Sequence, residues 1–168
     1  IKNAIKYLDE NYRNLYFHNG IYVVSESLGI LEKDINIFGN NSTIKVINDV
    51  EFLLDLYGIT LISDLSIDHT HKVLIDGFSI RTNNVASFNN VNFKNVLGLG
   101  HASSTTNQYF VQVNTNSKKV IFNDCTFNDI KNYGDNRHEF FGFCGFIFVL
   151  GESLVESKLI VEVNNCEF

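Results

Sequence analysis

A recurring six-residue pattern restricts the fold of this chain more than any other feature. Each copy has an apolar residue, two turn-forming residues and an apolar–polar–apolar triplet, and the copies are Phe88–Phe93, Phe122–Phe127, Val163–Phe168 and a looser one at Ile75–Ile80. Asn and Asp suit sharp corners because they tolerate left-handed backbone and hydrogen-bond locally. Alternation with a period of two indicates a strand with one buried face. The pattern predicts a corner that leads into a very short strand.

Such short strands need many neighbours, because an isolated strand pair is only marginally stable. A chain that winds into a solenoid pairs every turn with the turns before and after it, and corner amides stacked in register could then form ladders. The copies are unevenly spaced, which we attribute to inserted loops of different length. The alternative is an antiparallel β-sandwich, but hairpins favour Asn-Gly turns between longer strands. Only Asn19-Gly20 and Asp76-Gly77 resemble such turns.

The cysteines fit the same repeat. Cys125 and Cys166 occupy one slot of the pattern, which Phe78 and Val91 fill in the other copies. This slot predicts small core residues that face inward. A disulfide or a metal site is disfavoured, because no CxxC or Cys/His spacing is present.

Composition narrows the classes of protein. The chain has 168 residues, is 45% hydrophobic and carries a net charge of −6, with a pI of about 5.3. A nucleic-acid-binding role needs a basic footprint, which is absent from this composition. No apolar run approaches the ~20 residues of a membrane span, and no signal peptide or cofactor motif is visible. Because the chain starts at Ile1, lacks Met and ends inside a motif copy, we expect a piece of a longer polypeptide.

The first residues predict a short amphipathic helix. Apolar residues recur at helical spacing from Ile1 to about Tyr12, with charged residues between them. A helix there would cover the open end of a solenoid core and hide its first sheet edge. We therefore expect a capping helix over residues 1–14 and one domain of coils over residues 15–168.

The next segments carry a family resemblance. The order AIKYL, LYFHNGIYVV and INIFGNNSTIKV resembles the opening of the pectate-lyase-like right-handed parallel β-helix superfamily, in its phage tailspike or appendage branch. The residues that match the family pattern are Ala4, Ile5, Phe17, Gly20, Tyr22, Gly39 and Ile44. His18-Asn19 replaces the usual Pro-containing turn. The resemblance implies a single-stranded right-handed parallel β-helix, a homotrimer and a polysaccharide ligand.

Two longer inserts leave the repeat at the same point. Leu97–Gln108 follows the copy that ends at Val96, and Lys131–Glu139 follows the copy that ends at Ile130. Equivalent points of a solenoid stack on one edge, so we expect the inserts to lie side by side. Loops on a rigid scaffold are where binding and catalysis usually occur.

The inserts contain the candidate site for a saccharide. Asp135 and Glu139 could act as an acid–base or nucleophile pair, with His138 beside them. The candidate substrate-binding residues are His101, Tyr109, Tyr133 and Arg137. Tyrosine rings offer apolar faces to sugars, and Arg137 could hold the carboxylate of an acidic sugar. The alternative is a solvated loop whose charges pair with one another. Asp68-His69-Thr70-His71 suggests a metal site less strongly, because a further ligand is not obvious.

The function expected from these features is a module of a phage tail appendage that binds, and could depolymerise, host cell-surface polysaccharide. Two alternatives remain: a secreted polysaccharide lyase or glycoside hydrolase, and a non-catalytic adhesin or spacer. The expected location is the virion tail or the extracellular space, with no metal or other cofactor, no nucleic acid and no membrane span.

Overall fold

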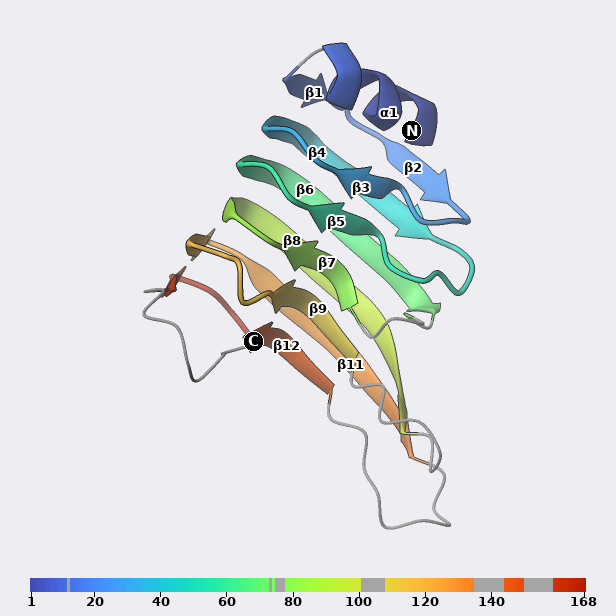
Figure 1. Ribbon diagram of the computed structural model, residues 1–168. Helices are drawn as coiled ribbons and strands as arrows, with labels where there is room; N and C mark the ends of the chain where they lie inside the picture. The colour runs from blue at the N-terminus through green and yellow to red at the C-terminus, as the bar shows by residue number, and fades with distance from the viewer. Residues whose placement is uncertain (12, 73, 75–77, 101–107, 135–143, 150–158) are drawn as a thin grey trace.

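The computed structural model describes residues 1–11, 13–72, 74, 78–100, 108–134, 144–149 and 159–168. This part of the chain is mostly β, with one short helix and two parallel sheets (Figure 1). Every pairing among the described strands is parallel. The all-β, parallel prediction is therefore confirmed, and the described strands form no antiparallel sandwich.

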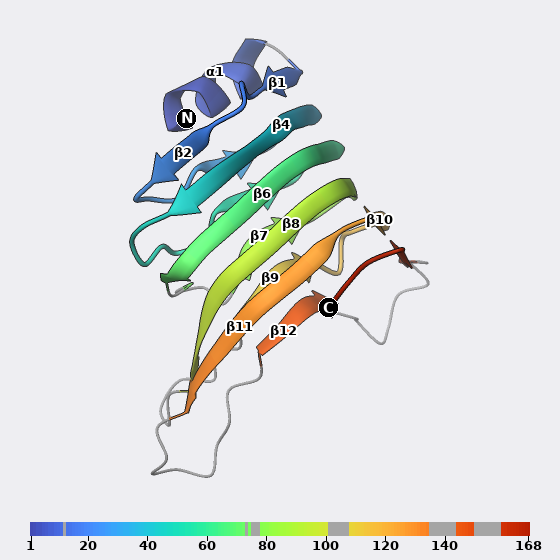
Figure 2. The ribbon, with the colours of Figure 1, turned by 180° about the vertical axis from the view of Figure 1, so that it is seen from behind.

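Sheet A is the larger sheet, with the order β1-β4-β6-β8-β10-β13; β2 also pairs with β4, and β11 with β8. Its strands are β1 (Asn14–Tyr16), β2 (Ile21–Val24), β4 (Ile35–Val46), β6 (Thr60–Lys72), β8 (Val85–Gly100), β10 (Lys119–Asn123), β11 (Thr126–Gly134) and β13 (Ile160–Asn164). The long strands form the layer that faces the viewer in Figure 2.

Sheet B has the order β12-β9-β7-β5-β3. Its strands are β3 (Gly29–Leu31), β5 (Leu54–Leu56), β7 (Phe78–Thr82), β9 (Gln108–Val113) and β12 (Cys144–Val149). From β3 onward the chain passes alternately from sheet B to sheet A, and each strand pairs with the strand of the next pass. The buried side chains of both sheets form one core cluster.

The motif copies lie in register in sheet A, as predicted. Phe88 pairs with Phe122, and Phe122 pairs with Val163. Asn123 Nδ2 donates to Asn89 Oδ1 at 2.8 Å, and Asn164 Nδ2 donates to Asn123 Oδ1 at 2.9 Å. These amides are 34 and 41 residues apart in sequence, yet they occupy equivalent places. Uneven spacing therefore leaves the stacking intact, and the predicted amide ladder is confirmed.

Aromatic rings continue the stacking inside the core. Phe93 lies 5.1 Å from Phe127 and Phe127 lies 5.2 Å from Phe168, between ring centroids, with nearly parallel planes. Cys125, in the same motif copy as Phe127, is buried in the core, and burial raises the pKa of its thiol to about 12. Cys125 and Cys166 are both free thiols. The inward-facing core role predicted for this slot is confirmed for Cys125, and Cys166 is half-buried.

One predicted copy was wrong and one real copy was missed. Phe78–Ile80 belongs to β7 of sheet B, where Ile80 pairs with Leu54 and Val111. Phe78 therefore does not share the slot of Cys125. The true neighbour of the Phe88 copy is Ile62–Ile67, because Ile62 pairs with Phe88 and Ile67 with Phe93. Residues 75–77 lie outside the described residues.

Left-handed corners bend the long strands of sheet A. The non-glycine residues with positive φ include Asn40, Asn41, Asp64, Thr70, His71, Asn90, Asn95, Asp124 and Asn165. Asn and Asp visit this conformation at low cost, which explains why they fill the middle of each copy. At Gly39 the strands approach so closely that a Cβ would lie 2.3 Å from the Asp64 carbonyl oxygen. Only glycine fits there.

Helix α1 (Lys2–Asn11) lies at the end of the sheets beside β1 (Figure 1). Ile5 and Leu8 are buried in the core cluster, while Lys2, Lys6 and Tyr7 are exposed. The predicted amphipathic helix is confirmed. Its apolar face covers the beginning of the core, where no preceding strand is present among the described residues.

Candidate functional site

The beginnings of the two predicted inserts lie side by side. Ile130 pairs with Val96, and the pairing continues without a shift to Gly134 and Gly100. Residues 97–100 and 131–134 are therefore strand, not loop, which corrects the predicted boundaries. Their neighbourhood is confirmed, because β8 and β11 end at the same level (Figure 2).

Most residues of the predicted saccharide site come after the described ends of β8 and β11. His101, Asp135, Arg137, His138 and Glu139 lie outside the described residues and stay predictions. The backbone of Tyr133 is in β11 of sheet A, opposite Leu99. Tyr109 is half-buried in β9 of sheet B, between Phe78 and Gly145 in register. The two tyrosines thus belong to different sheets.

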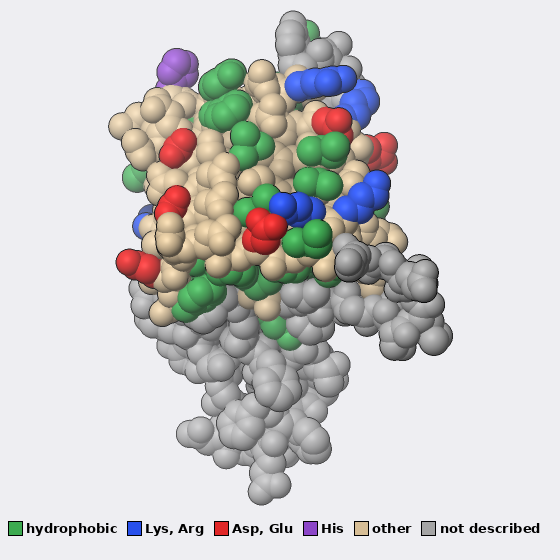
Figure 3. Space-filling view, turned by 90° about the vertical axis from the view of Figure 1, so that its left-hand side faces the viewer, with side chains coloured by type: hydrophobic (Ala, Val, Ile, Leu, Met, Phe, Trp, Pro, Cys, Tyr) green, Lys and Arg blue, Asp and Glu red, His purple; other side chains and the backbone are tan. Residues whose placement is uncertain are grey.

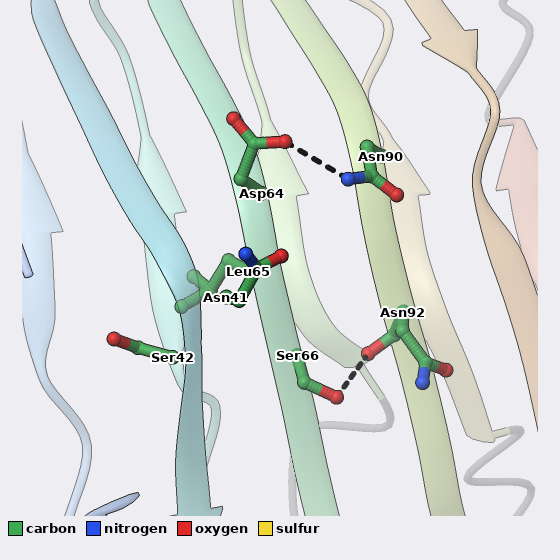
Figure 4. A pocket seen from close by; sticks show the side chains of 7 residues that line it. All are labelled: Asn41, Ser42, Asp64, Leu65, Ser66, Asn90 and Asn92. Carbon is green, nitrogen blue, oxygen red and sulfur yellow. Dashed lines mark hydrogen bonds between the residues drawn. The ribbon is translucent and has the colours of Figure 1, made fainter. Parts of the chain in front are cut away.

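The structure shows a different recess, on the solvent-facing side of sheet A. It is an open pocket of about 200 Å³, lined by Asn41, Ser42, Asp64, Leu65, Ser66, Asn90 and Asn92. Figure 4 shows that these residues come from β4, β6 and β8, at the bend made by the left-handed corners. We call this recess the corner groove.

One wall of the groove is part of a column of corner residues, each immediately before an inward-facing residue. The column consists of Asn41, Asp64, Asn90, Asp124 and Asn165. Asn41, Asp64 and Asn90 line the groove, and Asp124 and Asn165 continue the column beyond it. Asn90 Nδ2 donates to Asp64 Oδ1 at 2.9 Å (Figure 4). Paired strands are about 4.8 Å apart, so stacked carboxylates would repel strongly. Alternation of Asn and Asp avoids that repulsion.

The other wall is part of a second column, of strand residues two positions further on: Thr43, Ser66, Asn92 and Thr126. Ser66 and Asn92 line the groove. Ser66 Oγ donates to the Asn92 carbonyl oxygen at 3.5 Å, and Thr126 Oγ1 donates to Asn92 Oδ1 at 2.8 Å. Ser42 is buried beneath the groove and donates to the His18 carbonyl oxygen at 2.7 Å. Neighbouring strands therefore hold these hydroxyls and amides in fixed positions.

A charged column lies two residues beyond that wall. Asp68 pairs in register with Lys45 on one side and Lys94 on the other. Asp68 accepts hydrogen bonds from Asn95 Nδ2 at 2.8 Å and Thr70 N at 2.9 Å. Partial burial raises the pKa of Asp68, but these hydrogen bonds and the two lysines outweigh it, so the pKa lies below its ordinary value. Asp68 thus compensates the lysine charges locally.

An aromatic pair stands at the α1 end of the same sheet. The rings of Tyr16 and Phe38 stack at 4.8 Å, and Tyr16 is 67% exposed. Beside them Asn36 Nδ2 donates to Asn14 Oδ1 at 2.8 Å.

Figure 3 shows that hydrophobic, acidic and basic side chains are interspersed on the face at the left of Figure 1. Although the chain has a net charge of −6, the acidic side chains visible in that view form no continuous patch.

The histidines suggested as metal ligands have other surroundings. His69 is fully buried, and its Nε2 lies 2.8 Å from Ser79 Oγ. Burial lowers its pKa to about 4. The described residues contain no cluster of three or more His, Cys, Asp or Glu that could hold a metal ion. His69 is therefore a core residue, and Thr70 and His71 beside it adopt left-handed backbone conformations.

The corner groove presents fixed amide, hydroxyl and carboxylate groups to solvent. Amides and hydroxyls both donate and accept hydrogen bonds, so the groove suits a ligand rich in hydroxyl groups. Sequence reasoning missed it because polar outward positions look like an ordinary solvated face. The usable signal was the position of Asn, Ser and Thr within the motif, since register brings these positions together.

No protein-family model, no curated protein and no solved structure matches this chain. In the described ranges, no helix could cross a lipid bilayer. The identity of the site therefore rests on its chemistry.

Proposed function

We propose that the chain is a single-stranded right-handed parallel β-helix that binds polysaccharide through the corner groove, as a module of a tail appendage or a similar extracellular fibre. The observation that carries the proposal is the in-register wall of hydroxyls and amides along β4, β6 and β8. Sugar-binding sites combine such convergent polar groups with aromatic surface. The stacked Tyr16–Phe38 pair on the same sheet supplies that surface.

Parallel pairing supports the rest of the proposal. In a coil of stacked turns the chain would alternate between the same sheets and pair each strand with its counterpart one turn later, as these strands do, and stacked turns make a stiff scaffold. A homotrimer is part of the proposal, and light scattering on the intact polypeptide would test it. A monomer would count against an appendage and favour a secreted enzyme.

The binding test uses affinity electrophoresis against a panel of polysaccharides. The variant Ser66→Tyr fills the groove with a ring that strands tolerate well. We expect it to weaken binding at least about tenfold, because direct contacts and their geometry are lost. The control Ser87→Tyr places the same ring at an outward position of β8, between Leu61 and Ile121 in register and away from the groove. Equal binding by the two variants would remove the groove from the proposal.

Depolymerisation is a separate part of the proposal, because the groove itself offers one carboxylate, Asp64, rather than an acid–base pair. It rests on Asp135 and Glu139. Release of reducing ends or unsaturated sugars that stops in Asp135→Ala or Glu139→Ala would support it. Binding without any release would leave a non-catalytic adhesin.

A further inference from the structure

We infer that the corner groove selects neutral glycans and disfavours polymers that carry carboxylate or sulfate groups. This inference rests on the proposed function and specifies the ligand class of the same site. The basis is the charge of the groove. Among the residues that line it, Asp64 is the only charged side chain, and no Lys or Arg is present to hold an anionic sugar.

The negative charge repeats along the column of corner residues, beyond the groove itself. Asp124 occupies the corner equivalent to Asp64, with Asn90 between them. At a strand spacing of about 4.8 Å the two carboxylates are about 10 Å apart, which is close to one Debye length at physiological salt. Asp64 and Asp124 are both exposed. A polyanion that extends from the groove along this column would therefore meet a second carboxylate, Asp124, two strands after Asp64.

The nearby lysines compensate this charge only weakly. Lys45 and Lys94 lie in the column beyond Thr43 and Asn92, and both flank Asp68 in register. Asp68 is ionised and draws on the same two charges. Lys45 and Lys94 do not line the groove. They are therefore poorly placed to neutralise an acidic group next to Asp64.

Neutral sugars match the remaining chemistry. A sugar hydroxyl can donate to Asp64 or to the hydroxyl oxygen of Ser66 and accept from the amide of Asn92, since hydroxyls do both. Hydrogen bonds to a carboxylate are stronger than neutral ones. The same Asp64 that repels an anionic sugar thus favours a hydroxyl-rich neutral one.

The experiment measures binding of the intact chain to matched neutral and acidic polysaccharides, such as galactomannan and dextran against polygalacturonate and hyaluronate, at two salt concentrations. The test variant is Asp64→Asn/Asp124→Asn, because Asn occupies the same left-handed corner at Asn90 and Asn165. The control is Glu32→Gln/Glu51→Gln, which removes the same charge from two exposed positions outside the groove.

We expect the wild type to bind a neutral polymer at least about tenfold more tightly than any acidic one, as repulsion at about 4–5 Å implies. The test variant should narrow that ratio several-fold, and the control should leave it unchanged. Tighter binding of an acidic polymer by the wild type, or equal narrowing by test and control variants, would overturn the inference while leaving glycan binding in place. Binding to no polymer would overturn the proposed function as well.

Discussion

The two ends of the sheets differ in what covers their core. At the first end α1 buries Ile5 and Leu8, which are only 2% and 7% exposed. At the β13 end Val163 is 45% exposed and Phe168 is 63% exposed, although the equivalent residues Phe122 and Phe127 are fully buried. A residue in such a stack is buried by the layer before it and the layer after it. Stability should therefore depend on neighbouring layers rather than on a global centre.

The largest change in the free energy of unfolding is expected when one ring is removed from the middle of the aromatic stack. Phe127 lies between Phe93 and Phe168, so Phe127→Ala should lower the free energy of unfolding by about 3–5 kcal/mol. Phe168 is 63% exposed, so Phe168→Ala should cost about 1 kcal/mol. Urea denaturation followed by circular dichroism measures both. Equal losses would show that burial by the neighbouring layers does not determine how much a residue contributes to stability.

Acid should destabilise the fold through a histidine buried in its interior. Buried His69 has a native pKa of about 4, whereas an unfolded histidine titrates near 6.5. Between about pH 6.5 and pH 4 the unfolded chain therefore binds a proton that folded His69 does not, so the fall in pH stabilises the unfolded state. The free energy of unfolding should drop by about 3 kcal/mol across that window.

The variant His69→Gln keeps a partner for Ser79 and cannot titrate, so it isolates this contribution. The measurement is the difference between wild type and variant in urea unfolding at pH 7.5 and pH 4, which cancels the carboxylates common to both. Exposed His18 provides the control His18→Gln. A difference that does not change with pH would mean that His69 is solvated in solution.

A smaller effect is expected at the helix-covered end. Leu8→Ala removes a buried side chain from the contact of α1 with the core and should cost about 2–3 kcal/mol. The control Lys6→Ala changes an exposed position of the same helix and should stay within about 0.5 kcal/mol. If Leu8→Ala were as mild as its control, α1 would not be stabilising the end of the sheets.

The sequence allowed the register of the regular layers to be predicted, because each copy around Phe88 and Phe122 specifies both its corner and its inward face. The copy at Ile62–Ile67 escaped notice, since Ser63-Asp64 is a less obvious corner than Asn-Asn. The false copy at Phe78–Ile80 has the same local alternation but belongs to sheet B. Alternation reports which face is buried and not which sheet buries it.

The candidate site was harder to predict than the fold. The corner groove depends on three strands brought together by register, so no single stretch of sequence contains it. The charged residues around Asp135 drew attention because they are close in sequence. Polar residues such as Ser66 and Asn92 are informative only once their stacking is known.

The smallest effect is expected in the amide ladder. It compares a side chain that is bonded to the layers on both sides with one at the exposed end, at the level of one hydrogen bond. Asn123 donates to Asn89 and accepts from Asn164, whereas the side chain of Asn164 makes a single hydrogen bond of this ladder. Because both amides are partly solvated, Asn123→Ala should cost about 1 kcal/mol and Asn164→Ala about half of that. A double-mutant cycle over the two positions should give a coupling of about 0.5 kcal/mol. Zero coupling would mean that water replaces the ladder at its exposed end, and the difference between the ends would then come from apolar burial alone.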